Sequence, residues 1–324
     1  MNIGNDGAWL LKRLTDGGAP AELQDLPEVQ TLGTVWAQQF RETSVQMVYK
    51  DLKKYNGHTQ IQSPLDPQAR YSRKRNFEWL GDKVQVTETD DEGYPHIITD
   101  MVATNSNQTD YEELPLIQDR LIQRRCKPSQ HYVDAGYMSG PNLAHSQALE
   151  IDLIGPLPEV VTPQDLLPDG ITQSQFQMDL QTKIATCPQG HQARNPSLIV
   201  NTWSFHFPQK VCVVCPLHSR CCTGKGGRTV GMNIHYDLVQ TARARQKTEA
   251  FKKDYHQHRS GVEGSLSALV RGHGLRVSRY IGQNKRNLQA IFTGCAANLK
   301  RTAHWLAGER PQQRFKKSWT LRAA

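Results

Sequence analysis

Two acidic residues stand where the sequence offers the best prospects for chemistry. Asp134 lies in HYVDAGYMSG, residues 131–140, directly after the apolar end of an expected strand. Glu263 lies in RSGVEGSLS, residues 259–267, near the start of an expected apolar-faced helix. Loops and strand ends are where a scaffold displays reactive groups, and carboxylate oxygens are the ligands that Mg²⁺ prefers in proteins.

Arginines surround the second acid. Arg259 stands one helical turn before Glu263, and three more basic side chains follow at Arg271, Arg276 and Arg279. Two Mg²⁺ ions ~3.5–4 Å apart can clamp the attacking and leaving oxygens of a phosphodiester displacement, while arginines hold phosphates through paired hydrogen bonds. Each acid also has a simpler interpretation: Asp134 as the cap of the turn that follows it, and Glu263 as an ion-pair partner of its basic neighbours.

Cysteines form a second group of interest. The segments CPQG, CVVC and HSRCC contain Cys187, Cys212, Cys215, Cys221 and Cys222. Four sulfurs, from Cys187, Cys212, Cys215 and Cys222, could close a tetrahedral zinc site. Such a site would be structural, because no base or open coordination position is evident nearby. The alternative is that these cysteines are small apolar residues of a β-rich subdomain.

The elements that must position the acids are expected in residues 61–156. Alternation of apolar and polar residues predicts strands over 83–89 and 96–104, joined by a hairpin. Helical spacing of Leu114, Ile117 and Leu121 predicts a helix over 111–125. A third strand at 131–134, a short helix at 142–150 and a fourth strand at 151–157 follow. This order predicts an α/β fold with a mixed sheet flanked by helices, in which strand carboxyl ends host ligands.

The remaining segments divide the chain into further parts. Residues 1–60 are expected to be a helical region, residues 157–235 a cysteine-containing β-rich insertion, residues 236–307 a C-terminal helical part of the core, and residues 308–324 a basic tail. Within 284–306, an amphipathic pattern places six residues on one helix face: Leu288, Ile291, Phe292, Cys295, Leu299 and Ala303.

Bulk properties limit the class of protein. No apolar run in the 324 residues approaches the ~20 needed to span a bilayer. No secretory signal is evident at the start, and seven cysteines in such a chain indicate a reducing compartment. We therefore expect a cytoplasmic protein with no membrane partner. From residue 210 onward lie 22 of the 39 basic residues and 5 of the 31 acidic ones. This basic half predicts a polyanion partner, most simply nucleic acid.

The order of these motifs resembles bacterial insertion-sequence transposases of the DDE class. SPLDPQARYSRKR, KVQVTET, HYVDAGYMSGPNLAHS, IDLIGP, CPQGH, CVVCP and RSGVEGSLS…GLRVSRYIGQNKRNLQAIFTGCAANLKR occur in sequence, over about residues 5–310. The resemblance implies a ribonuclease-H-like catalytic core in which two Asp and one Glu bind two divalent metals, Mg²⁺ or Mn²⁺. By motif, Asp134 corresponds to the second Asp and Glu263 to the Glu.

The remaining correspondences are less direct. Asp66, in SPLDPQAR, is the expected first Asp, although an Asp before Pro is also an ordinary turn residue. Arg259 matches the family's Arg-x3-Glu, but Tyr255 has three residues between it and that Arg where the family has two. Relatives carry a longer N-terminal region, so the resemblance implies a truncated copy. The expected phosphate-binding residues are Arg259, Arg271, Arg276, Arg279 and Lys285.

The resulting prediction is a transposase that cleaves DNA and joins the freed 3′ end to a target. Its partners would be double-stranded DNA, as transposon ends and target, and a second copy of the chain in a homodimeric DNA complex. It would act at the nucleoid. Two alternatives stay open: an inactive remnant that only binds DNA, and a ribonuclease-H-like nuclease without strand transfer.

Overall fold

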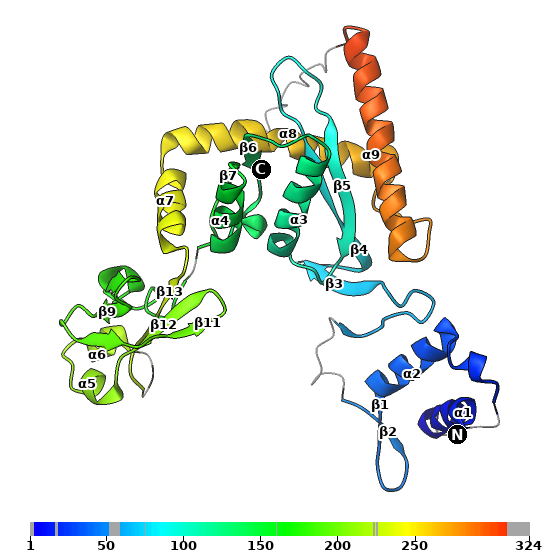
Figure 1. Cartoon of the computed structure of the whole chain (residues 1–324), viewed down its shortest axis with the longest axis horizontal. Helices are drawn as coiled ribbons and strands as arrows, with labels where there is room; N and C mark the ends of the chain where they lie inside the picture. Colours follow the sequence, from blue (N-terminus) through cyan, green and yellow to red (C-terminus); the bar gives the residue numbers. More distant parts are fainter. Residues whose placement is uncertain are drawn as a thin grey trace, which may run out of the picture. The chain divides into compact units, whose positions relative to one another are not determined.

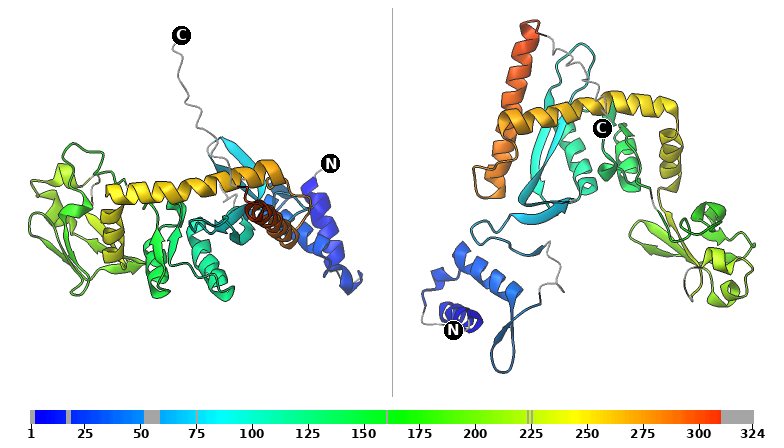
Figure 2. Two further views of the ribbon diagram at one scale, coloured as in Figure 1. Left: turned by 90° about the horizontal axis from the view of Figure 1, so that it is seen from above. Right: turned by 180° about the vertical axis from the view of Figure 1, so that it is seen from behind.

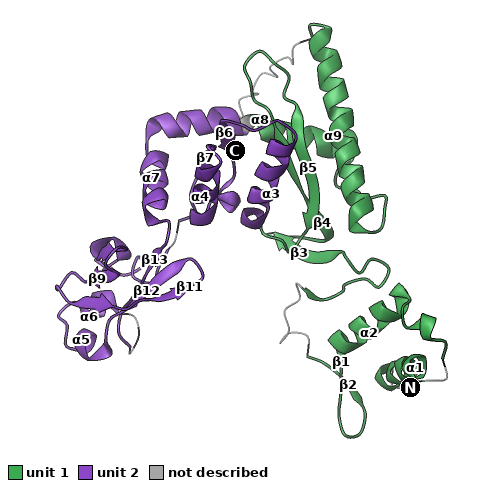
Figure 3. Cartoon of the chain, in the orientation of Figure 1, with its two compact units in different colours: residues 1–109, 260–324 green, residues 110–259 purple. Residues whose placement is uncertain are grey.

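The computed structural model describes residues 3–16, 19–51, 59–74, 76–159, 161–222, 224 and 226–309. The chain divides into two compact units (Figure 3). Unit 1 comprises residues 1–109 and 260–324, and unit 2 comprises residues 110–259. The predicted basic tail lies outside the described residues from position 310 onward.

Unit 1 begins with two packed helices and a hairpin. α1 (Ile3–Thr15) lies against α2 (Pro27–Gln39), after the short 3₁₀ helix η1 (Ala21–Leu23). A Cβ on Gly7 would overlap the ring of Trp36, so this helix contact requires glycine. β1 (Phe40–Glu42) and β2 (Met47–Tyr49) pair where the sequence predicts more helix. Thr43 Oγ1 accepts from Gln46 N and closes the turn, a local bond that competes with helix formation. The rest of that predicted helix, residues 52–58, lies outside the described residues.

The main sheet of unit 1 is antiparallel, in the order β3-β4-β5. Its strands are β3 (Arg70–Lys74), β4 (Phe77–Glu88) and β5 (Ile98–Asn105). β4 and β5 confirm the predicted strand pair. One face packs on α8 (Glu249–His273) and α9 (Gln283–Leu306) through a core that contains the fully buried Leu269.

α9 lies alongside β5 (Figures 1 and 2) and closes the free edge of the sheet. Asn287 Oδ1 accepts a hydrogen bond from Ala103 N at 2.8 Å. Asn298 accepts from Ile98 N at 2.8 Å and donates to Ile98 O at 2.9 Å. The two asparagines are eleven residues apart, three helical turns, so they leave α9 on the same side. Unpaired strand edges invite pairing with other chains, and these side chains occupy the edge instead.

The face of α9 that meets the sheet differs from the amphipathic face that the sequence predicts. Ala290, Gly294 and Ala297 are buried, and a Cβ on Gly294 would lie 2.9 Å from Met101 Sδ. Small residues let the helix backbone approach the strand closely. The large apolar residues Leu288 and Phe292 are exposed instead.

A buried polar network ties β4 to both helices of unit 1. The Glu88 side chain is 1% exposed and pairs with Arg301 of α9 at 2.9 Å. Ser265 of α8 donates to the other Glu88 oxygen at 2.8 Å, and Arg301 also donates to Ser265 Oγ at 2.7 Å. Each buried charge therefore has a partner, which is what makes burial tolerable.

Unit 2 begins with the predicted helix–strand–helix–strand series. α3 (Asp110–Gln123) buries Leu114, Ile117 and Leu121, as predicted. β6 (Gln130–Tyr132) and β7 (Asp152–Ile154) form a parallel pair connected by α4 (Gly140–Ala148). An α/β architecture is thus confirmed. Where the sequence predicts one mixed sheet, the described strands form a three-stranded antiparallel sheet in unit 1 and a parallel pair in unit 2.

The segment predicted as an insertion contains a β-rich subdomain with a core of its own, in which Phe205, Phe207 and Ala185 are almost completely buried. One three-stranded sheet has β8 (Gln177–Asp179), β9 (Ile184–Thr186) and β10 (Gln192–Arg194); the other has β11 (Ser197–Ile199), β12 (Thr202–His206) and β13 (Thr229–Asn233). The short helices are η5 (Gln173–Gln175), α5 (Gln209–Val213) and α6 (His218–Cys221). α7 (Tyr236–Gln246) leads back to α8, whose first eleven residues belong to unit 2.

None of the described helices combines the length and the apolar character that a bilayer crossing requires.

Candidate functional site

Asp134 lies just beyond the carboxyl end of β6. Val133 N donates to Ile154 O at 2.8 Å and extends the parallel pairing to the residue before the acid. Asp134 then occupies the N-cap position of the 3₁₀ helix η4 (Ala135–Tyr137), but its side chain makes no capping hydrogen bond. Ser139 caps the next helix, α4, by accepting from Asn142 N at 3.2 Å. The simple interpretation of Asp134 as a cap is therefore wrong.

The Asp134 carboxylate instead forms a bidentate ion pair with Arg259 of α8. Arg259 Nε donates to Oδ1 at 2.7 Å and Nη2 donates to Oδ2 at 2.7 Å. The Arg259 side chain is 18% exposed and the Asp134 side chain 53% exposed. The guanidinium fixes the plane of the carboxylate, while the carboxylate itself stays open to solvent.

Tyrosines surround this pair and hold the strand end. Tyr255 OH donates to Val133 O at 3.1 Å, one helical turn before Arg259 on α8. Burial, followed by the charge of Asp134, raises the pKa of Tyr255. Burial also raises the pKa of Tyr137, with the charges of Asp110 and Asp134 adding to it. Both phenols therefore stay neutral near neutral pH, and Tyr255 acts as a hydrogen-bond donor.

Tyr132, at the end of β6, makes contacts that the sequence did not reveal. Tyr132 OH donates to Asp254 Oδ2 at 3.0 Å, and its ring stacks on His258 with centroids 4.5 Å apart. Burial, followed by the bond to Asp254, raises the pKa of Tyr132 to about 12. In the sequence, the only sign of this contact was that Asp254 and His258 are four residues apart on one helix face. Their partner, Tyr132, lies 122 residues from Asp254 and could not be identified from that spacing.

A second bidentate pair lies at the other end of the same two strands. Arg245 Nη1 and Nη2 donate to the two oxygens of Asp152 at 2.7 and 2.9 Å. Asp152 is the first residue of β7, whereas Asp134 follows the last residues of β6. The two pairs have nearly the same chemistry but lie at opposite ends of parallel strands, and ligands bind at carboxyl ends in open α/β sheets.

Asp66 lies in unit 1, in a different environment. Arg286 of α9 donates to Asp66 Oδ2 and also pairs with Asp82 at 2.6 Å. The side chains of Arg286 and Asp82 are 8% and 5% exposed. The other oxygen of Asp66, Oδ1, is buried and accepts no hydrogen bond from a described residue. One oxygen of Asp66 is thus committed to an ion pair, and one is available for a further partner.

Glu263 and the predicted phosphate-binding residues beyond it belong to unit 1. Glu263 is exposed on α8, four residues after Arg259. Four cationic side chains that follow it are exposed and make no ion pair with any described residue: Arg271, Arg276, Arg279 and Lys285. Their charges are therefore available to a polyanion.

The predicted zinc ligands lie together in the insertion. Cys187, Cys212, Cys215 and Cys222 line one cavity with Cys221. Within the described ranges, however, no three His, Cys, Asp or Glu side chains are already arranged to hold a metal ion.

Comparison with known proteins supports the predicted resemblance over about the C-terminal third of the chain. Residues 186–303 match the family model described as a transposase DDE domain. The match begins among the short strands at β9 and runs through α8 and most of α9, and it supports the predicted resemblance to DDE-class transposases. No curated protein and no solved structure matches the chain significantly.

Proposed function

We propose that the chain is a DNA transposase that cleaves a phosphodiester bond and joins the freed 3′ end to a second duplex. The observation that carries the proposal is the Asp134–Arg259 pair. It presents an oriented, solvent-open carboxylate at a strand carboxyl end, in a chain related to DDE-class transposases. The position at a strand carboxyl end distinguishes this pair from the Asp152–Arg245 pair, in which the acid is the first residue of β7.

Each of these residues then has a distinct part. Arg259 orients the two oxygens of Asp134, and Tyr255 fixes the strand end below them. Glu263 follows Arg259 by four residues in the sequence, and it remains our predicted second metal ligand. The exposed cations from Arg271 to Lys285 hold DNA phosphates, and the affinity they contribute falls as salt rises.

The oxygen donors fit a hard divalent cation such as Mg²⁺ or Mn²⁺. Mg²⁺ usually takes one or two carboxylates together with substrate phosphate and waters, and Asp134 and Glu263 are both exposed carboxylates. A carboxylate has about four lone-pair sites, so Asp134 can keep Arg259 while accepting another partner. When bound, such ions would activate the attacking oxygen and stabilise the leaving one. Asp66 remains our predicted third ligand, through the oxygen that Arg286 leaves free.

Metal-dependent nicking of supercoiled plasmid DNA tests the catalytic part of the proposal. We expect nicking with Mg²⁺ or Mn²⁺ to fall at least about a hundredfold in Asp134→Ala and Glu263→Ala, because a lost ligand removes several kcal/mol of stabilisation of the transition state. DNA binding in a gel-shift assay should stay within about twofold. Asp152→Ala is the matched control, since it breaks the equivalent pair at the other strand end. Equal activity in Asp134→Ala and Asp152→Ala would refute the assignment.

Strand joining separates the competing functions. Incubation of a pre-cut DNA end with a target plasmid should yield a covalent joint product for a transposase. Nicking without a joint product would indicate a nuclease, and binding without either would indicate a remnant that only binds DNA. Asp66→Ala, compared with Asp82→Ala, tests the third ligand: loss of nicking in the first variant alone supports it.

A further inference from the structure

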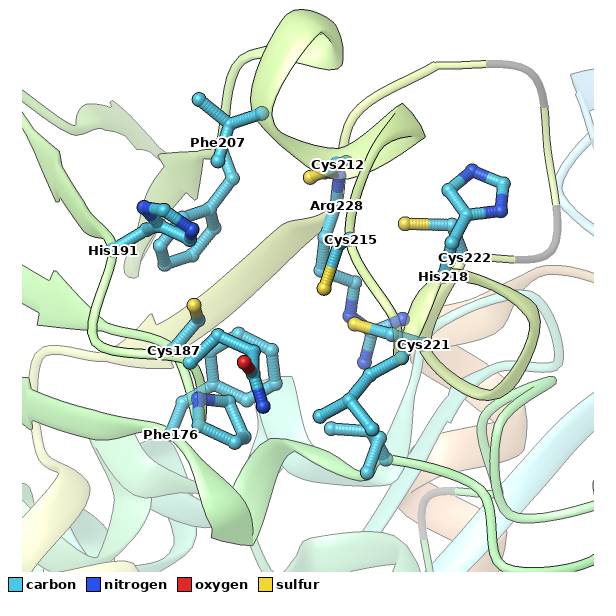
Figure 4. Close-up of a pocket in the computed structure, with 15 residues that line it drawn as sticks. Phe176, Cys187, His191, Phe207, Cys212, Cys215, His218, Cys221, Cys222 and Arg228 are labelled. Carbon is cyan, nitrogen blue, oxygen red and sulfur yellow. Dashed lines mark hydrogen bonds between the residues drawn. The ribbon is translucent and has the colours of Figure 1, made fainter.

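The cysteine-lined cavity of the insertion plays no part in the proposed DNA chemistry. Five of the seven cysteines line it, and the other two, Cys126 and Cys295, are exposed elsewhere. Figure 4 shows the sulfur atoms arranged around one space, beside the aromatic rings of Phe176 and Phe207. The space measures about 30 Å³, room enough for a small ion or a water.

Two tight turns present the first three sulfurs. Between β9 and β10, Gly190 N donates to Cys187 O at 2.8 Å and Cys187 N donates to His191 O at 2.9 Å. Gly190 has φ +80°, a conformation that favours glycine. At the end of α5, Cys215 N donates to Cys212 O at 3.2 Å. Both turns are short and hydrogen-bonded, so they hold the backbone of these three cysteines rigidly beside the cavity.

The short helix α6 returns the chain to the same space. His218 N donates to Cys215 O at 3.0 Å, and Cys222 N donates to His218 O at 2.8 Å. Arg228 N donates to Cys212 Sγ at 3.4 Å. The chain thus returns Cys215, Cys221 and Cys222 to the cavity that Cys187 and Cys212 also line.

Cys212 is buried in the core of this subdomain, and Cys187, Cys221 and Cys222 pack against that core. Protein interiors are close-packed, yet these thiols surround an open space. A disulfide would use two of the five sulfurs and leave the others unexplained. Four sulfur donors around one centre suit a tetrahedral, thiophilic ion. The sulfurs do not yet stand at metal-binding spacing in the described residues, so ligation requires rotation of the cysteine side chains.

We propose that Cys187, Cys212, Cys215 and Cys222 bind one structural Zn²⁺ ion in the insertion, with Cys221 outside the coordination sphere. Four thiolates close the tetrahedron, so no position remains for catalysis. The ion would join the β9–β10 turn to the segment that carries α5 and α6. Because a structural zinc contributes its binding energy to folding, the insertion should depend on it more than the sheet of unit 1.

Metal analysis of the purified full-length chain tests this proposal. We expect one zinc per chain by mass spectrometry, and the visible absorption of tetrahedral cobalt–thiolate coordination after Co²⁺ exchange. Cys187→Ser, Cys212→Ser, Cys215→Ser and Cys222→Ser should each bind less than about a tenth of this zinc. Cys221→Ser and the exposed Cys295→Ser are matched controls and should retain one zinc. Zinc loss from Cys221→Ser with retention in Cys222→Ser would overturn the ligand set.

A second measurement on the wild-type chain covers variants that fail to fold. Chelation of the zinc should expose residues 171–233 to limited proteolysis while β4 and β5 stay protected, and added Zn²⁺ should reverse this. Three results would overturn the proposal: a wild-type chain with no zinc, an iron–sulfur chromophore, or a disulfide in non-reduced peptides from this region.

Discussion

Two arginines, one in each unit, form ion pairs with aspartates that differ in how far they are buried. Arg286 lies between two carboxylates, Asp66 and Asp82, and is 8% exposed. Arg259 pairs with one carboxylate, Asp134, which is 53% exposed. The first arrangement removes three charges from water, while the second holds an acid at the surface. Breaking a buried pair leaves an uncompensated charge in a poorly solvated place, whereas an exposed pair contributes little to stability. We infer that Arg286 stabilises the fold and that Arg259 prepares a site.

The largest expected effect comes from removing the charge of Arg286. Arg286→Met keeps most of the side-chain volume but leaves Asp66 and Asp82 unpaired. We expect the free energy of unfolding to fall by about 3–5 kcal/mol, measured by chemical denaturation.

Lys285→Met is the matched control, because Lys285 is the neighbouring residue and is exposed. It should change stability by less than about 0.5 kcal/mol. Similar losses in the two variants would remove the distinction drawn between the buried and the exposed charge.

Acid should weaken the strand that leads to Asp134. His131 on β6 is buried, and burial lowers its pKa to about 4. The unfolded chain binds this proton near the ordinary pKa of ~6.5, so the folded state is favoured above that pH and loses stability as pH falls toward 4. The loss amounts to about 3 kcal/mol. Unfolding of His131→Asn should be less sensitive to pH over this window by that amount, and equal pH dependence of the two chains would contradict the assignment.

An intermediate effect is expected from a neutral contact on the helix that carries Arg286. Asn298→Ala leaves the N–H and the carbonyl of Ile98 without their partner. We expect a loss of about 1–3 kcal/mol, the cost of an unsatisfied buried group, in equilibrium unfolding. Asn284→Ala, at an exposed position of α9, should cost less than about 0.5 kcal/mol. If Asn298→Ala lowered the free energy of unfolding as much as Arg286→Met, the large effect at Arg286 could not be attributed to its charge.

The smallest effect on stability should come from Asp134. Asp134→Asn removes the charge of an exposed acid, so the free energy of unfolding should change by less than about 1 kcal/mol. The same substitution should abolish nicking. A chain destabilised as strongly as by Arg286→Met would instead mark the Asp134–Arg259 pair as structural.

Local patterns in the sequence predicted much of the scaffold. The strands β4 to β7 and the helices α3 and α4 were found from alternation and helical spacing, since each buries one face over a continuous stretch. Asp134 was found for a related reason: a charge directly after an apolar strand interrupts a local pattern. The hairpin of β1 and β2 was missed, because local bonds in its turn, such as that from Gln46 N to Thr43 Oγ1, leave no pattern of apolar residues in the sequence.

Contacts between distant parts of the chain could not be predicted in the same way. Arg259 and Asp134 are 125 residues apart, and Arg286 and Asp66 are 220 apart. The packing face of α9 was misjudged because hydrophobic spacing marks large side chains, whereas close approach to β5 favours Ala290, Gly294 and Ala297. Such choices depend on shape and on partners that only the folded chain brings together.

The asparagines of α9 that cover the edge of β5 are synthesised long after β5 itself. Ribosomes add about 5–20 residues per second, so roughly 10–40 s separate the emergence of β5 from that of Asn298. Throughout this interval nothing from α9 can shield the strand, and all of residues 110–259 must be made before its cover arrives. Until α9 is made, the edge of β5 is therefore uncovered, and the nascent chain needs other protection, such as chaperones, against pairing with the strand edges of other chains.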